Sequence, residues 1–244
     1  MDGFTYTNIF ETKGIEYLVI IAFLLLLIPF WVSLNRQVKI KEQMRKAMGV
    51  LSLGILKVEQ GIFYSRNHTW AYLEKSGNAK VGLDDLLLHI TGEVKVRHLK
   101  NPGESICKGE LLAEVDQNGK SLQIFSPISG MVIDSNPALD ENYTLLNEDP
   151  YGKGWIYSLK PTNWIAEIPS LYLADEATNW IKKELERYKD FLALNMGKHM
   201  PGNSIDILQD GGELADNSLA ELPKEMWHDF QKEFLNPQRE HLNN

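Results

Sequence analysis

The chain has 244 residues, of which 43% are hydrophobic and 24% are charged, and its formal net charge at pH 7 is −8. This composition excludes a wholly disordered chain and allows one globular domain with additional segments. The negative balance argues against a nucleic-acid-binding protein, because such proteins present a basic face to the phosphates. The single cysteine, Cys107, cannot form an internal disulfide, which fits a reducing compartment.

An apolar run near the N-terminus predicts a transmembrane helix over residues 15–34, preceded by a short extracytoplasmic segment, residues 1–14. The stretch from Tyr17 to Leu34 carries no charge. As a helix it is about 27 Å long, close to the ~30 Å hydrocarbon core of a bilayer. A cleavable signal peptide fits less well, because the preceding segment is acidic and no small-residue cleavage site follows. We therefore expect membrane lipid to be a partner of this segment.

The residues after the apolar run predict its orientation. Five basic residues follow it closely: Arg36, Lys39, Lys41, Arg45 and Lys46. Because positive flanks stay on the cytoplasmic side, we expect a single pass with the N-terminus outside and the main domain in the cytoplasm. The predicted location is the bacterial inner (cytoplasmic) membrane.

Residues 35–61 predict a juxtamembrane amphipathic helix. Apolar residues recur there at steps of three and four, which places them on one helical face: Ile40, Met44, Ala47, Leu51, Ile55 and Val58. Lysines and arginines occupy the other faces. We expect this helix to act as a stalk that packs on the following domain.

Residues 62–165 have the pattern of an all-β barrel or sandwich. Short runs of β-branched and aromatic residues alternate with turn signals at Ser76-Gly77-Asn78, Pro102-Gly103 and Asn118-Gly119. One short helix is predicted within them, with the sequence LDDLLLHIT. Its two carboxylates, Asp84 and Asp85, are predicted to cap the first turn, since neighbours on a helix do not face one substrate.

The C-terminal third predicts two helices separated by a polar segment. Residues 166–196 contain the C-terminal helix of the domain, and residues 197–244 form an acidic, loosely ordered tail that ends in an aromatic helix. In that last helix, Trp227, Phe230 and Phe234 recur at helical spacing and require a groove to lie in. The groove belongs either to the chain's own domain or to a partner protein, so these three residues are candidates for partner binding.

Four blocks of sequence together carry a family likeness. They are HTW at 68–70, VGLDDLLLHITGEV at 81–94, PISGMVIDSNPAL at 127–139 and NEDPYGKGWIYSLKP at 147–161. With these blocks the chain resembles the H protein of the glycine cleavage system, which has the lipoyl-domain fold. The resemblance implies a mainly β protein, a flattened hammerhead barrel with flanking helices. It also implies a carrier with lipoic acid on a lysine at a hairpin tip, and no catalytic residues.

The hairpin at residues 112–130 departs from the family pattern by one residue. Counting back from Pro127, the family's lysine position falls on Gly119 and its acidic predecessor on Asp116. An Asn118-Gly119 pair predicts a two-residue turn, so Lys120 would be the first residue of the return strand. Because side chains alternate across a strand, the shift sends the lysine to the opposite face. We therefore predict no cofactor; the alternative is lipoate on Lys120, which a longer loop at the tip would allow.

No other chemistry is indicated. The six histidines lack metal-ligand spacing, so no metal is expected, and neither a phosphate-binding glycine loop nor a nucleophile motif occurs. Two functions remain. One is a non-lipoylated adaptor among the protein subunits of a membrane-associated complex, of which an electron-transfer assembly is one example. The other is a lipoyl carrier of a glycine-cleavage-type system that uses Lys120.

Overall fold

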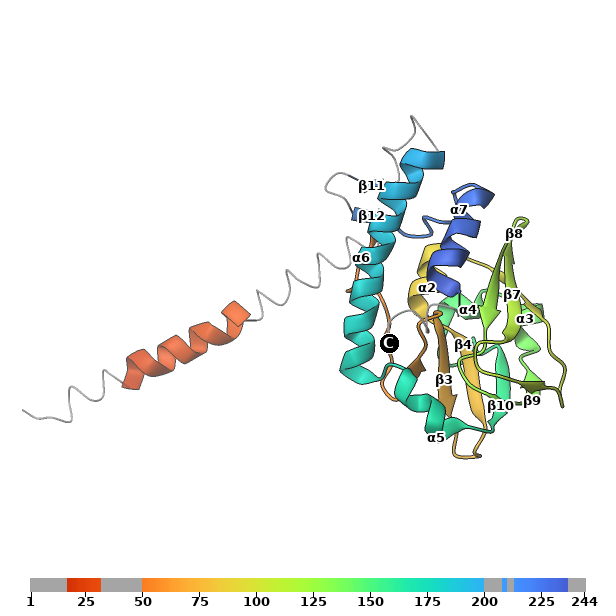
Figure 1. Cartoon of the computed structure of the whole chain (residues 1–244). Helices are drawn as coiled ribbons and strands as arrows, with labels where there is room; N and C mark the ends of the chain where they lie inside the picture. The colour runs from red at the N-terminus through yellow and green to blue at the C-terminus, as the bar shows by residue number, and fades with distance from the viewer. Residues whose placement is uncertain (1–16, 32–49, 200–207, 210–212, 237–244) are drawn as a thin grey trace, which may run out of the picture. The chain divides into compact units, whose positions relative to one another are not determined.

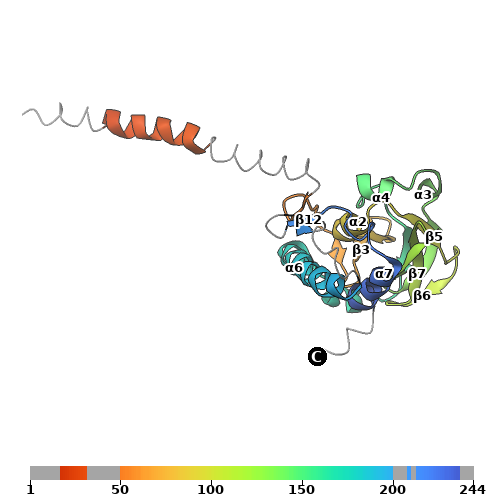
Figure 2. The same cartoon turned by 90° about the horizontal axis from the view of Figure 1, so that it is seen from above.

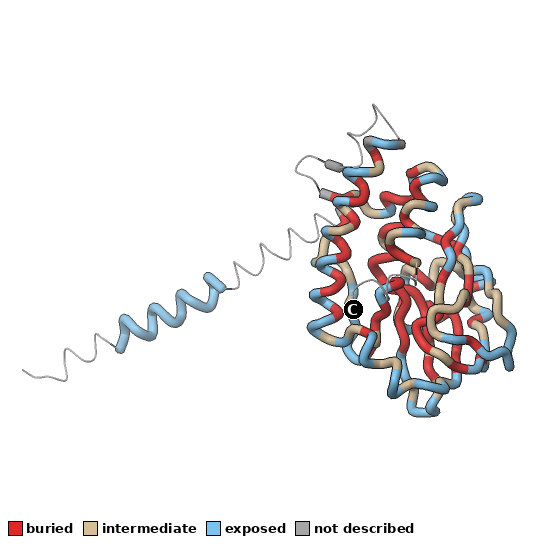
Figure 3. Tube along the Cα trace, in the orientation of Figure 1, coloured by how far each residue is buried: buried red, intermediate tan, exposed pale blue. Residues whose placement is uncertain are grey.

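The computed structural model describes residues 17–31, 50–199, 208–209 and 213–236 (Figure 1). The chain divides into two units, residues 1–48 and residues 49–244, and each is described by itself. The described strands belong to the second unit, and the buried parts of its chain trace come together between its sheets and helices (Figure 3).

The larger sheet has six antiparallel strands in the order β2-β3-β4-β10-β9-β6. They are β2 (Phe63–Tyr64), β3 (Thr69–Leu73), β4 (Ala79–Leu83), β10 (Tyr157–Pro161), β9 (Gly130–Ser135) and β6 (Ser105–Ile106). The turn between β3 and β4 contains Gly77 at φ 86°, a conformation that glycine adopts without strain. The turn predicted at this position is therefore confirmed.

The smaller sheet has three antiparallel strands in the order β5-β7-β8. They are β5 (Lys95–His98), β7 (Leu111–Gln117) and β8 (Lys120–Phe125). Val115, Leu122 and Ile124 turn to one face and are buried, while the residues between them are more exposed. The prediction of a mainly β domain with flanking helices is confirmed.

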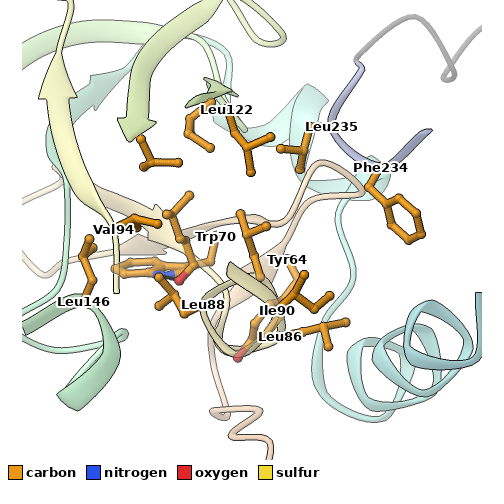
Figure 4. Close-up of a cluster of buried hydrophobic side chains, with 14 of the residues drawn as sticks. Tyr64, Trp70, Leu86, Leu88, Ile90, Val94, Leu122, Leu146, Phe234 and Leu235 are labelled. Atoms are coloured by element: carbon orange, nitrogen blue, oxygen red, sulfur yellow. Dashed lines mark hydrogen bonds between the residues drawn. The ribbon is translucent and has the colours of Figure 1, made fainter. Parts of the chain in front are cut away.

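A tryptophan in β3 determines which residue its partner strand can carry. Trp70 is fully buried in the core shown in Figure 4, and its Nε1 donates a hydrogen bond to the Leu83 carbonyl at 2.8 Å. It pairs with Gly82 of β4, where a Cβ atom would come within 2.7 Å of the indole ring. Glycine at this strand position therefore makes room for the ring.

Short helices connect the strands. They are α2 (Asp85–Thr91), α3 (Ala138–Glu141), α4 (Leu145–Glu148), α5 (Trp164–Glu167) and the 3₁₀ turn η1 (Ile168–Ser170). The predicted cap of α2 is confirmed for Asp84, whose Oδ1 accepts a hydrogen bond from the Leu87 N–H at 2.8 Å. Asp85 has another role, because its Oδ2 accepts from the backbone N–H of Lys57 at 2.7 Å.

The long helix α6 (Ala174–His199) is the C-terminal helix that was predicted within residues 166–196. It begins at Ala174, after the separate turn η1, which contains Pro169. Its apolar face is buried in the second unit through Ile181, Leu185, Tyr188 and Leu192.

A C-terminal strap, residues 213–235, follows α6 in the described chain and lies against the domain (Figure 1). It consists of β12 (Glu213–Ala215), a turn, α7 (Lys224–Phe230) and one π-helical turn, η2 (Gln231–Leu235). β12 lies between β1 (Val50–Leu51) and β11 (Leu208–Gln209) in a small sheet. The prediction of a loosely ordered tail is wrong for residues 213–218, where Leu214 and Ser218 are buried, and the predicted aromatic helix that follows is confirmed as α7. The buried apolar side chains of the strap are Leu214, Leu219, Leu222, Met226, Trp227, Phe230, Phe234 and Leu235.

The predicted amphipathic helix over residues 35–61 is wrong for its described part, residues 50–61. Residues 50–51 form β1, and turns and irregular chain follow them. Leu51 is buried against the domain, and Lys57 donates its backbone N–H to a side chain rather than to a helical carbonyl. The apolar residues of this segment are therefore spaced as they are because an irregular chain packs on the domain. Residues 35–49 lie outside the described part.

The first unit is described only over residues 17–31, which form a helix with exposed side chains. Among the residues that the structure describes, no helix is both long enough and apolar enough to cross a membrane. The predicted extracytoplasmic segment, residues 1–14, lies outside the described residues, as do the ends of the predicted span, residues 15–16 and 32–34.

Replacing Phe230 with alanine tests how firmly the strap is docked. Its ring is fully buried and lies 4.6 Å from Phe234, 5.8 Å from Tyr188 and 6.0 Å from Phe191, measured between ring centroids. Removing it should lower the free energy of unfolding by about 3–5 kcal/mol, measured by urea denaturation. Lys232→Ala, exposed in the next turn, is the matched control and should change it by less than about 0.5 kcal/mol. Equal effects of the two variants would contradict a docked strap.

Candidate functional site

The β7–β8 hairpin ends in a two-residue turn formed by Asn118 and Gly119. Their φ angles are 53° and 81°, and Gln117 pairs with Lys120 across the turn. Two positive φ angles are typical of the type I′ turn that Asn-Gly favours. The predicted turn is confirmed, and Lys120 is the first residue of β8.

Gly119 occupies the outer position of the tip. No atom lies within 4 Å of the place where a Cβ would stand, so the position faces open space. Its N–H donates to Oδ1 of Asp116 at 3.4 Å, which braces the turn from the preceding strand. Gly119 stands where the family resemblance predicts a lysine, and glycine has no side chain to which lipoate could be attached.

The amine of Lys120 is held by the strap. Nζ donates hydrogen bonds to the backbone carbonyls of Ala220 and, at 3.2 Å, Leu222. It also lies 5.3 Å from the centroid of the Trp227 ring, a cation–π distance. The amine thus has three contacts on one segment of the chain, more than 90 residues away in sequence.

A second strap residue bonds to the outer edge of β8. The side-chain Oε1 of Gln231 accepts from the Gln123 N–H at 2.7 Å, and its Nε2 donates to the Gln123 carbonyl at 3.2 Å. Leu235 points toward Leu122 of the same strand (Figure 4). The strap therefore covers the hairpin along β8 as well as near its tip.

The turn of the strap caps the C-terminal end of α2. The last carbonyls of a helix have no partner within it. Here the N–H groups of Asn217 and Leu219 donate to the carbonyls of His89 and Ile90 at 2.7 and 3.0 Å. The indole Nε1 of Trp227 then donates to the Leu219 carbonyl at 2.7 Å and fixes the turn.

The three aromatic residues predicted as candidates for partner binding are buried within this chain. Trp227, Phe230 and Phe234 are exposed by 1%, 0% and 3%. Helix α7 lies beside α6 when the domain is seen from above (Figure 2), and α6 contributes Tyr188 and Phe191 to the aromatic cluster. Of the two alternatives, the groove of the chain's own domain is the one observed.

A buried histidine links α6 to the start of α2. Nδ1 of His68, in the turn between β2 and β3, lies 2.8 Å from Oδ2 of Asp84, and its Nε2 lies 3.6 Å from Oε2 of Glu184 on α6. Burial alone would lower the pKa of His68. The Coulombic attraction and hydrogen bond of Asp84, followed by those of Glu184, outweigh it and raise the pKa to about 9.

A second histidine links the strap to the same helix start. Nδ1 of His89 lies 2.8 Å from Oδ1 of Asp216, and its Nε2 lies 3.4 Å from Oδ2 of Asp85. Burial again acts to lower the pKa, but hydrogen bonds and charges of the two carboxylates raise it to about 9. The neighbouring residues Asp84 and Asp85 therefore contact one histidine each, and each histidine bridges to a C-terminal element.

No arrangement for a metal ion is present in the described residues, since none of their His, Cys, Asp and Glu side chains form a suitable group of three. A depression of about 380 Å³ adjoins the hairpin tip on the side of β5. It is lined by Glu93, Lys95, Asp116, Gln117, Asn118 and Tyr143. The exposed turn residues and this depression are parts of the hairpin that other molecules can reach.

Sequence reasoning identified the tip residues but not their partners. Gln231 and Asp216 belong to no motif, and the carbonyls that hold Lys120 carry no side-chain signal at all. One feature of the sequence does point to the strap. The C-terminal helix has an aromatic face that needs a groove, and the same chain contains a long hairpin beside which it could pack.

A family model described as Glycine cleavage H-protein matches residues 62–184. The Probable glycine cleavage system H protein of Thermococcus kodakarensis is 33% identical over 133 residues, which cover 54% of this chain and 98% of that protein. The Glycine cleavage system H protein of Psychrobacter cryohalolentis is 34% identical over 116 residues, 48% of this chain and 91% of that protein. Among solved structures, a glycine cleavage system H protein from Mycobacterium marinum is similar with a TM-score of 0.45 and 25% identity, covering 50% of this chain and 98% of that chain.

The two histidine bridges predict how stability depends on pH. Their folded-state pKa values of about 9 lie above the ordinary histidine value of 6.5. Their contribution should therefore be complete below about pH 6.5 and be lost as the pH rises through 9. Urea denaturation between pH 6 and 10 should show this decline, and His68→Gln and His89→Gln should each flatten it. A wild-type stability that stays constant or rises between pH 6.5 and 9 would contradict the bridges.

Proposed function

The chain belongs to the glycine cleavage H-protein family, and we propose that it serves as a non-lipoylated structural or adaptor subunit of a membrane-associated protein complex. It has no catalytic role in this proposal, in keeping with a family of carriers. An electron-transfer assembly is one complex in which a small tethering subunit would fit, by analogy alone.

The position of the Lys120 amine carries the proposal. In the family the lysine that takes lipoate stands at the tip, and here the tip is Asn118-Gly119. Lys120 lies one residue into β8 and donates to two strap carbonyls. Acylation would remove the positive charge and leave the nitrogen a single N–H donor. It would therefore cost at least one of these hydrogen bonds and the cation–π contact.

The strap supports the same proposal from the side of the hairpin. The family model ends at residue 184, whereas the strap covers residues 213–235. A carrier must present its hairpin to the active sites of other enzymes. Here the strap bonds to Gln123 on the edge of β8 and to the Lys120 amine. An arrangement that holds the hairpin against its own domain favours a fixed subunit over a moving carrier.

The membrane part of the proposal is supported by the apolar run of residues 17–34. Residues 17–31 of it are helical, and their apolar side chains are exposed. A large exposed apolar surface marks a site of contact with lipid or protein. The basic residues that follow favour an inner-membrane location with the N-terminus outside and the β domain in the cytoplasm. Tethering suits a permanent subunit, whereas a shuttling carrier gains nothing from it.

The alternative function is a lipoyl carrier that uses Lys120. Membership of the family favours it, and Lys120 directly follows the tip residues. For this function the strap contacts of the amine would have to open, so that the lysine could reach both a ligase and the partner enzymes.

Intact-mass measurement of the native chain, extracted with detergent from the membrane fraction, separates the two functions. We expect the mass of the unmodified chain and stable co-purification of other subunits. Lys120→Arg should leave those subunits bound, because it retains the charge. Lipoate on Lys120 in a large fraction of molecules, or loss of the partners in Lys120→Arg, would contradict the adaptor function.

Stability of a Lys120 variant provides a second test. Because the amine makes charge-assisted hydrogen bonds and a cation–π contact, Lys120→Ala should lower the free energy of unfolding by about 1–2 kcal/mol. Lys75→Ala is the matched control, since Lys75 is exposed in the β3–β4 turn, and should have an effect below about 0.5 kcal/mol. Urea denaturation measures both. A Lys120→Ala variant as stable as the control would show that the amine is not a structural group.

A further inference from the structure

β8 is an edge strand whose outward backbone groups can be assigned from its pairing. It lies at the end of the order β5-β7-β8, with β7 on one side only. In a two-residue hairpin the residues that flank the turn, here Gln117 and Lys120, exchange their hydrogen bonds across the strands. Lys120, Leu122 and Ile124 therefore bond inward to β7. The N–H and carbonyl groups of Ser121, Gln123 and Phe125 point outward.

The sequence of this edge lacks the usual protection against strand addition. Residues 121–126 read SLQIFS, with no charge and no proline. Natural proteins blunt exposed edges with charges, prolines, bulges or a covering element, because an uncharged β-prone segment pairs readily with another chain. The nearest charge, Lys120, is engaged by the strap. Protection of this edge must therefore come from elsewhere in the molecule.

The side chain of Gln231 reproduces the bonds of a neighbouring strand. Its Oε1 accepts from the Gln123 N–H at 2.7 Å and its Nε2 donates to the Gln123 carbonyl at 3.2 Å. A residue on an added antiparallel strand would make this same pair of bonds with Gln123. Helix α7 and the η2 turn stand alongside β8, where such a strand would run (Figure 1).

We propose that the strap guards the β8 edge, and that the partner it excludes is the β8 edge of a second copy of this chain. An antiparallel β8–β8 pair about a two-fold axis can place Gln123 opposite its own counterpart. Each Gln123 then donates to and accepts from the other, which replaces the two Gln231 bonds one for one. Such an interface is self-complementary, as a symmetric dimer requires. The inference is independent of whether Lys120 carries lipoate.

Gln231→Ala in the full chain, in detergent, tests the proposal, with Lys232→Ala as the matched control one residue away. Amide exchange at Gln123 in the dilute protein should become about tenfold faster, since its N–H loses a hydrogen bond. Light scattering over a concentration series should show dimers for Trp227→Ala/Gln231→Ala, in which the strap also loses a buried anchor, but not for the wild type or the control. On dimerisation, exchange within residues 121–125 should slow again.

Adding Ser121→Pro to Trp227→Ala/Gln231→Ala should restore the monomer. Proline removes an outward N–H without touching the bonds to β7, so it blocks strand addition alone. Two results would overturn the proposal. One is unchanged exchange at Gln123 in Gln231→Ala, because the glutamine would then not cover the edge. The other is faster exchange at Gln123 with no association of Trp227→Ala/Gln231→Ala at any concentration.

Discussion

The backbone conformation of Asn118 and Gly119 determines where every side chain of the β7–β8 hairpin points. Two consecutive positive φ angles are possible at few residue types, so the turn has one position, and the pairing of the two strands follows from it. With that register Leu122 and Ile124 enter the core. Lys120 leaves the tip and points toward the strap, and the outer edge of β8 presents Gln123. The chemistry available at the hairpin therefore depends on one turn.

The strap meets three separate requirements of the domain with one short segment. Its turn supplies N–H donors to the open carbonyls at the end of α2 and carbonyl acceptors to the amine of Lys120. Its η2 turn supplies the side chain of Gln231 to the outer edge of β8. These polar contacts are individually modest, and burial of Trp227, Phe230 and Phe234 stabilises the position in which all of them form. Burial of the strap's apolar face therefore contributes more to its docking than any single polar contact does.

The sequence predicted the features that depend on neighbouring residues. The Asn118-Gly119 turn, the cap at Asp84 and the helix that became α6 are of this kind, because turn, cap and helix preferences are local. The contacts of the strap could not be predicted in the same way. Gly, Asn and Asp between residues 197 and 217 are typical of a disordered tail in sequence, whereas the burial of Leu214 and Leu219 depends on tertiary partners that no local pattern indicates. Backbone carbonyls such as that of Ala220 are present at every position and carry no signal.

The helix predicted over residues 50–61 was wrong for a related reason. Steps of three and four between apolar residues fit a helix, but they also fit an irregular segment whose apolar residues dock on a neighbouring surface. Leu51 and the N–H of Lys57 are satisfied by the rest of the domain, so helix formation offers this segment no advantage. Periodicity identified Leu51, Ile55 and Val58, but Leu53 and Leu56, outside the periodic set, pack against the core as well.

The pairing of β1 with β12 has a mechanical consequence. Val50–Leu51 is where the described chain enters the domain, and its strand partner there is the strap rather than the barrel. Force applied to the chain at Val50–Leu51 would act first on the β1–β12 hydrogen bonds. It would then act on the strap, which bonds to Lys120 and Gln123. Force applied at Val50–Leu51 and the exposure of the β7–β8 hairpin are therefore connected through the strap.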